Sequence, residues 1–331
     1  MPKILCSIST KGRYHTFLPL AIQSIISQTR KVDLLVIYDD NDEPEDMRTY
    51  PVYQQLFKLM DLKNIKWEWV FANKKGQHHN HQSANERAAR EGYDFVWRVD
   101  DDNSAEPNVL KNLEKAITSN KHIGAVGGAI LTPNWDIATR HATAKIEDID
   151  NESNIQWGYI PKQKKVEHLH CSFLYRAGVY DYNLALSKVA HREETLFTYG
   201  MHKLGYELYV IPDTITWHFK SESGGIRSTN NHLLYAQDEH IFRNFLQHKN
   251  NTIVILNSGM GDHIVFKHVL PYLKNPIVYT CYPDIVPGKS IQEAINTYGD
   301  IEFCNVYKKM DQWSWTQSLE KAYRKLYRVD L

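Results

Sequence analysis

Apolar strands that end in carboxylates alternate with helical segments in the first third of this 331-residue chain. The run Leu34–Tyr38 stops at Asp39 and Asp40, and the run Phe95–Val99 stops at Asp100–Asp102. Strands that are apolar on both faces are typical of a parallel sheet covered by helices. Ligands bind outside the carboxyl ends of such strands. The sequence therefore predicts an α/β fold whose strand ends bring acids together.

The predicted elements follow the order strand, helix, strand. We expect strands at residues 3–9, 34–38, 65–73 and 93–99, and helices at residues 17–27, 53–60, 81–92 and 108–119. The helices carry apolar residues at helical spacing, and Gly92 is the glycine expected just past a helix end. Beyond residue 124 we expect strands at 168–180 and 206–219, with a helix at 192–205 between them. A polar junction at 248–251 predicts two domains, residues 1–248 and 249–331.

Composition limits the possible functions. Lysine and arginine total 39, as do aspartate and glutamate, and the pI is near 7.3, which argues against a strongly basic nucleic-acid binder. No apolar run is long enough to span a membrane, and the N-terminus lacks signal-peptide features, so we expect a cytoplasmic protein. The cysteines at positions 6, 171, 281 and 304 lack zinc spacing and are expected to be reduced.

The triplet Asp100–Asp102 allows two interpretations. Three adjacent carboxylates repel one another, so they cost free energy unless a cation or strong donors compensate. One interpretation is a loop of solvated acids before a helix. The other is a site for a hard divalent cation, Mn²⁺ or Mg²⁺, which binds carboxylate and phosphate oxygens.

The order of these segments resembles glycosyltransferase family 2, which has the GT-A fold. The phrase "AIQSIISQT" at residues 21–29 is similar to the end of the family's first helix, and Asp39–Asp40 and Asp100–Asp102 stand at matching strand ends. Asn85 matches the family's asparagine. Further matches follow in the family's order, namely Glu193, Glu194, Gly205, Tyr206, Pro212, Asp213 and His218. The resemblance covers about residues 3–220.

The resemblance implies a site for a UDP-sugar and a divalent cation. Asp100 and Asp102 would hold the ion, with His218 as a third ligand or, alternatively, a structural histidine. The nucleotide-binding residues would be Thr10, Asp39, Asp40, Arg98 and Asp101. Arg98 is also consistent with a plain salt bridge. The histidine-rich segment at residues 74–82 is expected to be a polar loop over the donor phosphates, with Lys74 and Lys75 as phosphate partners.

Family members of this kind invert the anomeric centre, so one base deprotonates the acceptor hydroxyl. Glu194 stands where the family has its aspartate and is the expected base, with Glu193 as the second choice. The alternative is that both are ordinary acids at a helix N-terminus, where the helix dipole favours them.

The last part of the chain predicts a small α/β appendage. Its segment "VILNSGMGDHIVFKHVLPYL" at residues 254–273 resembles the start of a heptosyltransferase-like GT-B domain. Asp262 and His263 are expected to form a structural turn. The leading hypothesis is therefore an inverting, metal-dependent glycosyltransferase acting on a glycan hydroxyl. Alternatives are a phage-type enzyme acting on a hydroxymethylated DNA base, a non-catalytic nucleotide-sugar-binding module, and a metal-dependent phosphohydrolase or nuclease.

Overall fold

The computed structural model describes residues 1–132, 145–149, 160–219, 224–225, 232–247, 252–256, 259–273 and 276–298. The chain divides into two compact units, which are described separately. The first unit is residues 1–183 with 188–232, and the second is residues 184–187 with 233–331. The predicted domain boundary at residue 248 lies downstream of this division, and the roles predicted for the two parts stay predictions.

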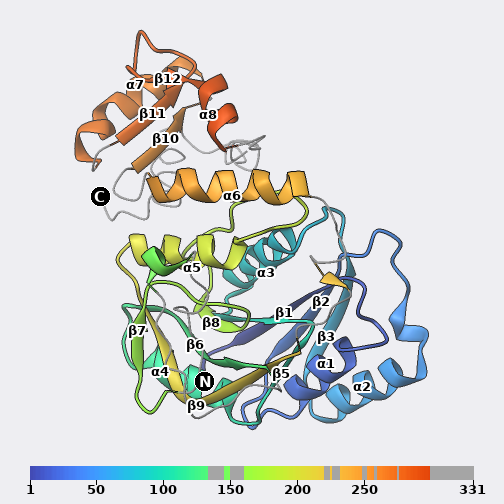
Figure 1. Ribbon diagram of the computed structural model, residues 1–331. Coiled ribbons are helices and arrows are strands. Elements are labelled where there is room, and N and C mark those ends of the chain that lie inside the picture. The colour runs from blue at the N-terminus through green and yellow to red at the C-terminus, as the bar shows by residue number, and fades with distance from the viewer. Residues whose placement is uncertain are drawn as a thin grey trace. The chain divides into compact units, whose positions relative to one another are not determined.

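The first unit is built on one mostly parallel sheet (Figure 1). Its strands, within the described residues, run in the order β3-β2-β1-β4-β8-β6-β9-β5, with β7 beside β9. They are β1 (Ile4–Thr10), β2 (Leu34–Asp39), β3 (Lys66–Phe71), β4 (Phe95–Asp100), β5 (Asn103–Ala105), β6 (Ile123–Leu131), β7 (Lys164–Val166), β8 (Phe173–Arg176) and β9 (Glu207–His218). Strands β1 to β4 are parallel, whereas β8 lies antiparallel between β4 and β6. This confirms the predicted α/β fold.

Helices cover both faces of the sheet. They are α1 (Leu18–Ile26), α2 (Pro51–Leu62), α3 (Gln77–Glu91), α4 (Val109–Thr118) and α5 (Glu193–Lys203), with short 3₁₀ turns at Met47–Thr49 and Ile146–Asp148. Apolar residues of α1, α2 and α4 form one core with the sheet, and those of α3 and α5 form a second core on its other face. Because both faces are covered, β1 and β2 are buried along their whole length.

The register of the parallel strands brings the acidic strand ends together. Thr10 at the end of β1 pairs with Asp39 at the end of β2, and Ser9 pairs with Asp100 at the end of β4. The three strands therefore finish at one edge of the sheet. This confirms the expectation that separate strands deliver their carboxylates to a common place.

Gln28, in the phrase that follows α1, ties that helix to the chain beyond β4. Its amide nitrogen donates to the carbonyl oxygens of Ser24 at 3.0 Å and Glu106 at 2.9 Å, and its amide oxygen accepts from Leu110 N–H at 3.0 Å. Gln28 is buried, so its amide cannot bond to water and depends on these partners within the protein. The side chain thus fixes the start of α4 and the segment that connects Asp102 to it.

Helix α3 begins earlier than predicted. The segment expected to be a polar loop over phosphates instead forms the first turns of α3, which starts at Gln77, and it buries His78 and His81. The ring Nδ1 of His81 is hydrogen-bonded to Ser7 Oγ at 3.2 Å. The prediction was wrong for this part of the segment because histidine scores as polar, whereas these two rings are buried. Lys75 precedes the helix, and its ammonium donates to the Asn41 carbonyl at 2.5 Å.

Strands β6 and β9 approach so closely at Gly128 that no side chain fits there. A Cβ on Gly128 would lie 2.0 Å from the carbonyl oxygen of Thr214. Gly128→Ala must therefore push two paired strands apart, and overpacking of this kind typically lowers the free energy of unfolding by about 1–3 kcal/mol. Urea denaturation followed by tryptophan fluorescence measures this loss.

Gly261→Ala is the matched control, because a Cβ at that helical position has no neighbour within 4 Å. It should leave stability unchanged or raise it by up to about 1 kcal/mol, since alanine is the better helix former. Equal stability of both variants would contradict the β6–β9 packing.

The second unit contains α6 (His232–Gln247), β10 (Thr252–Leu256), α7 (Met260–Val269), a 3₁₀ turn (Leu270–Tyr272), β11 (Pro276–Thr280), β12 (Lys289–Ser290) and α8 (Ile291–Tyr298). Strands β10, β11 and β12 form a parallel sheet over a small apolar core. His263, predicted in a structural turn, lies within α7, and its ring nitrogens are 3.0 and 3.1 Å from the carbonyl oxygens of Gly259 and Leu256. Among the described residues of the chain, no helix is long and apolar enough to cross a membrane.

Candidate active site

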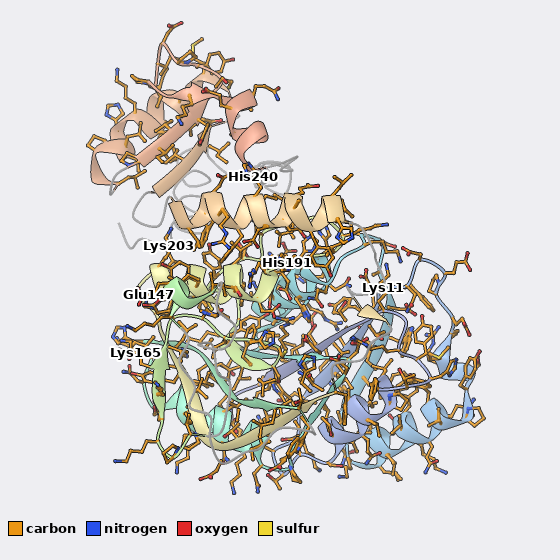
Figure 2. The ribbon with its side chains drawn as sticks, viewed as in Figure 1. Lys11, Glu147, Lys165, His191, Lys203 and His240 are labelled. Carbon is orange, nitrogen blue, oxygen red and sulfur yellow. The ribbon has the colours of Figure 1, made fainter. Side chains whose placement is uncertain are left out.

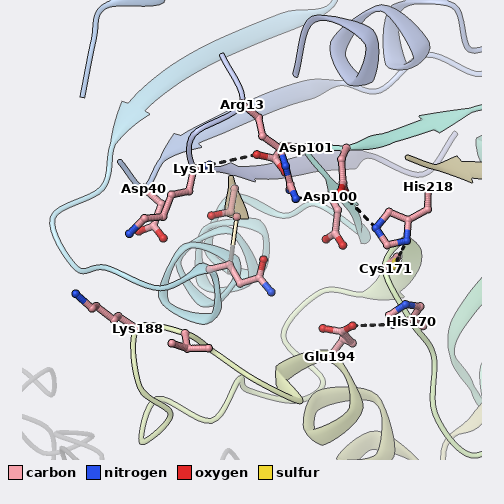
Figure 3. A pocket seen from close by; sticks show the side chains of 15 residues that line it. Lys11, Arg13, Asp40, Asp100, Asp101, His170, Cys171, Lys188, Glu194 and His218 are labelled. Carbon is pink, nitrogen blue, oxygen red and sulfur yellow. Dashed lines mark hydrogen bonds and ion pairs between the residues drawn. The ribbon is translucent and has the colours of Figure 1, made fainter. Parts of the chain in front are cut away.

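A polar pocket lies at the carboxyl ends of β1 and β4 in the first unit (Figure 3). Its cavity volume is about 160 Å³, below the roughly 300–1,000 Å³ of typical small-molecule sites. Its ionisable and metal-ligating side chains are Lys11, Arg13, Asp40, Asp100, Asp101, Asp102, His170, Cys171, Lys188, Glu194 and His218. The pocket therefore collects most of the predicted site, together with several residues that the sequence did not single out.

Asp101, the middle member of the aspartate triplet, is held by three hydrogen-bond donors. It accepts from the Arg13 guanidinium, from Thr10 Oγ1 at 2.8 Å and from Lys11 N–H at 3.2 Å. Burial raises the pKa of Asp101 to about 6, although the adjacent Arg13 charge and these donors lower it. Arg13 thus supplies the compensation that buried, adjacent carboxylates require, and Asp101 joins the turn after β1 to the turn after β4.

The three residues predicted to hold a metal ion come together. Asp100, Asp102 and His218 all line the pocket, and Asp102 Oδ2 lies 3.4 Å from His218 Nε2. Asp102 also pairs with Arg13 at 3.1 Å. Strand pairing explains the proximity, because β9 ends at His218 opposite Asn103, the residue after Asp102. Carboxylates and an imidazole are ligands that a hard divalent cation accepts, but the ligand atoms of these three residues do not form a group within 4.8 Å of one another in the described structure.

Arg98 differs from its predicted role as a nucleotide contact. Its side chain is fully buried beneath the pocket, where the guanidinium lies 2.9 Å from Asp100, 2.6 Å from Glu193 and 3.6 Å from Glu194. Burial lowers the pKa of Arg98, but the three carboxylates outweigh this and hold that pKa well above its ordinary value. Arg98 is therefore a permanent cation that anchors acids of two elements, β4 and α5.

The two glutamates at the start of α5 occupy different environments. Glu193 has no exposed side-chain surface, and it contacts Arg98 and the amide of Gln77, the latter at 3.0 Å. Glu194 lines the pocket, and its Oε1 lies 2.8 Å from His170 Nδ1. Burial opposes the charge on Glu194, but Arg98 and His170 hold its pKa well below the ordinary value. Only Glu194 of the pair is placed to meet a ligand as a carboxylate.

The predicted nucleotide-binding residues separate into two groups. Asp40 lines the pocket and accepts from Gly76 N–H at 3.0 Å, and burial raises its pKa. Asp39 does not line the pocket, because its oxygens accept from the Tyr14 hydroxyl and from Asn41. Thr10 is fully buried and supports Asp101. Asp39 and Thr10 thus shape the wall behind the pocket.

Several pocket residues were missed in the sequence. Arg13 and Lys11 flank Gly12, whose left-handed φ of 69° bends the chain after β1. His170 and Cys171 precede β8, which reaches this part of the sheet only through long-range pairing with β4 and β6. The chain bends at Cys171, whose φ of 52° is in the left-handed region. No local pattern of residues predicts this bend. Lys188 enters from the segment before α5.

Comparisons with solved structures identify the fold. The chain is similar to TarS 1-349 of S. aureus, with a TM-score of 0.51 and 14% identity over 81% of this chain and 70% of that one. It is also similar to GalNAc-T7 solved with UDP, GalNAc and Mn²⁺, with a TM-score of 0.55 and 11% identity over 89% and 57% of the two chains. The chain spans 41% of a longer TarS structure. No family model and no curated protein matches the sequence.

At these identities the similarity concerns the fold. The curled, mostly parallel sheet with helices on both faces is the arrangement of GT-A-like glycosyltransferases. The pocket lies at the edge where open α/β sheets bind ligands. The first unit of this chain therefore has a GT-A-like glycosyltransferase fold.

Proposed function

We propose that this protein is an inverting, metal-dependent glycosyltransferase that transfers a sugar from a UDP-sugar to a hydroxyl group of a glycan. The observation that carries the proposal is the composition of one pocket. It gathers hard-metal ligands, three cationic side chains and a partly buried, charged carboxylate, Glu194, on a GT-A-like fold. The GalNAc-T7 structure, which contains UDP and Mn²⁺, supports the choice of a uracil nucleotide and this type of ion.

Asp100, Asp102 and His218 would hold Mn²⁺ or Mg²⁺. When bound, such an ion stabilises the charge that develops on the leaving diphosphate. Lys11 and Lys188 line the same pocket, and Figure 3 shows both on the side of Asp40, opposite His218 and His170. A diphosphate between the lysines and the metal ligands would therefore be neutralised from two sides.

Glu194 is the proposed general base. In an inverting transfer the acceptor hydroxyl attacks the anomeric carbon from the face opposite the diphosphate, and a carboxylate takes up its proton. Glu194 faces the pocket from α5, whereas Asp101 and Asp102 are paired with Arg13 from the side of β1. The hydrogen bond to His170 fixes the carboxylate, so little reorganisation is needed when the acceptor binds.

Ligand-dependent melting tests the donor site. UDP, GDP, CDP and ADP are each added with Mn²⁺, Mg²⁺ or EDTA, and a ligand that binds only the native state raises the melting temperature. UDP with Mn²⁺ is expected to stabilise by about 2.7 kcal/mol at one hundred times its dissociation constant. EDTA should remove most of that shift.

Asp102→Asn should also remove the metal-dependent shift, because the variant loses a charged ligand without changing side-chain size. Asp61→Asn is the matched control, since Asp61 lies outside the pocket and accepts a hydrogen bond from Trp67 at 2.9 Å. It should respond to UDP like the unmodified protein. A response to no nucleotide with either metal would overturn the proposal and favour a module without this chemistry.

A further inference from the structure

Three side chains of mixed nitrogen and sulfur chemistry meet beside the carboxylates of the pocket. One ligand atom from each of His170, Cys171 and His218 lies within 4.8 Å of the other two. We name these residues the His–Cys–His cluster. Cys171 and His218 are largely buried, and all three residues line the pocket, so a small ion can reach them from solvent. The carboxylate site just described uses only His218 of the three.

One pair of ligand atoms in the cluster already has the spacing of a tetrahedral zinc centre, and the third lies within 4.8 Å of both. Cys171 Sγ lies 3.6 Å from His218 Nδ1. Two ligand atoms of one tetrahedral zinc ion are separated by about 3.3–3.7 Å, as follows from Zn–N and Zn–S bonds of about 2.0–2.3 Å. The His170 and His218 rings lie 6.2 Å apart between centroids and are close to perpendicular, at 68°. Two imidazoles in this arrangement can direct one nitrogen each toward a common point.

The hydrogen bond between His170 and Glu194 prepares His170 as a ligand. Its Nδ1 lies 2.8 Å from Glu194 Oε1. The neutral tautomer that donates from Nδ1 carries its lone pair on Nε2, which is the nitrogen that would bind the ion. Carboxylates commonly orient metal-binding histidines in this way, and they raise the basicity of the ring. The bond therefore has a role in metal binding that is separate from acceptor deprotonation.

We propose that the His–Cys–His cluster is a Zn²⁺ site, with Nε2 of His170, Sγ of Cys171 and Nδ1 of His218 as protein ligands. A thiolate and two imidazoles suit Zn²⁺ better than Mn²⁺ or Mg²⁺, which favour oxygen ligands. Binding forms a Zn–S bond and releases the thiol proton of Cys171 to solvent. The fourth position is open to water or to a pocket carboxylate.

Zinc at this site excludes the hard cation from His218. The ring presents Nδ1 to Cys171 and Nε2 to Asp102, at 3.6 and 3.4 Å. A neutral imidazole has one lone pair, so zinc on Nδ1 leaves a proton on Nε2, which then donates to Asp102. The ion predicted at Asp100 and Asp102 loses its third ligand. This consequence, which rests on the proposed function, makes Zn²⁺ an inhibitor that competes with Mn²⁺.

Cobalt substitution tests the site without any nucleotide. Co²⁺ is titrated into the metal-free protein, and the thiolate-to-Co²⁺ charge-transfer band in the near ultraviolet is recorded, followed by displacement with Zn²⁺. The band should appear at one equivalent, be abolished in Cys171→Ser, and be lost on adding Zn²⁺. The control is Cys281→Ser, because Cys281 also has a histidine nitrogen within 3.8 Å but no third ligand beside it among the described residues. It should keep the band.

Two further variants keep the test decisive. His170→Gln should weaken Zn²⁺ binding, measured by competition with a chromophoric chelator, by more than the 10- to 100-fold that loss of an orienting partner costs. Glu194→Gln should weaken it by about 10- to 100-fold. Absence of the band in the unmodified protein, or its persistence in Cys171→Ser with a normal melting temperature, would overturn the zinc site.

The competition is measured separately by melting with UDP and Mn²⁺. Added Zn²⁺ should remove the shift in the unmodified protein and leave it in Cys171→Ser. A cobalt band without any UDP response would retain the zinc site and overturn the proposed donor site. A UDP response that Zn²⁺ does not change, together with the band, would contradict the shared use of His218.

Discussion

Glu194→Gln is expected to reduce sugar transfer by about 10²- to 10⁴-fold, the range that a positioned general base contributes. The amide keeps the size of the side chain and can still face His170, but it cannot accept the acceptor proton. Binding of UDP and Mn²⁺ should remain, because neither contacts this carboxylate in the proposed arrangement. The measurement is the initial rate of UDP release with saturating donor, compared with the UDP melting shift of the same sample.

Glu207→Gln is the control for the loss of a glutamate charge. Glu207 pairs with Lys165 at 2.7 Å, and Figure 2 shows Lys165 at the edge of the first unit, far across the view from Lys11 of the pocket. The rate of this variant should equal that of the unmodified protein. A Glu194→Gln rate within tenfold of normal would show that Glu194 is not the base, and Glu193→Gln would then be the next test.

Arg98→Met is expected to be the most destabilising single change. The guanidinium is completely buried and contacts Asp100, Glu193 and Glu194. Methionine fills a similar volume, but it leaves the carboxylates without their cation. Removing one partner of a buried ion pair typically costs about 3–5 kcal/mol, a large part of the 5–15 kcal/mol that stabilises most proteins. Urea denaturation followed by tryptophan fluorescence gives the loss.

Two comparisons separate this effect from simple loss of charge. Arg48→Met breaks an exposed pair with Asp46, and it should change the midpoint little, because solvent-exposed pairs contribute little. The double variant Arg98→Met/Glu193→Gln removes one uncompensated charge, so it should be more stable than Arg98→Met alone. If Arg98→Met unfolds at the same urea concentration as Arg48→Met, the buried network does not stabilise the fold.

The sheet and the acidic edge could be predicted because they follow from local patterns. Apolar runs such as Leu34–Tyr38 define strands. Neighbouring parallel strands of one sheet finish at the same edge, so Asp40 and Asp100–Asp102 had to approach one another. For these acids the position along a strand was sufficient. His218 was predicted from the family resemblance instead, and the pairing of β9 with β5 places it beside them.

The positions of other residues depend on tertiary packing, which a short stretch of sequence does not encode. Cys171 reaches the pocket because β8 inserts antiparallel between β4 and β6, an order that cannot be read from the strands themselves. Arg98 was left open between a phosphate contact and a salt bridge, because alternation along a strand does not say how deeply one face is buried. His78 was expected in a loop, because a buried histidine and a solvated one look alike in sequence.

The hydrogen bonds of Gln28 have a consequence for finding related proteins. The side chain bonds only to the chain itself, joining α1 to the start of α4, so selection on it acts through folding rather than through ligand binding. A diverged relative that had lost Asp100 and Asp102, the proposed metal ligands, would still need this glutamine. In a sequence search, the "SQT" phrase at residues 27–29 would therefore report shared architecture, and only the aspartates would report the proposed metal site.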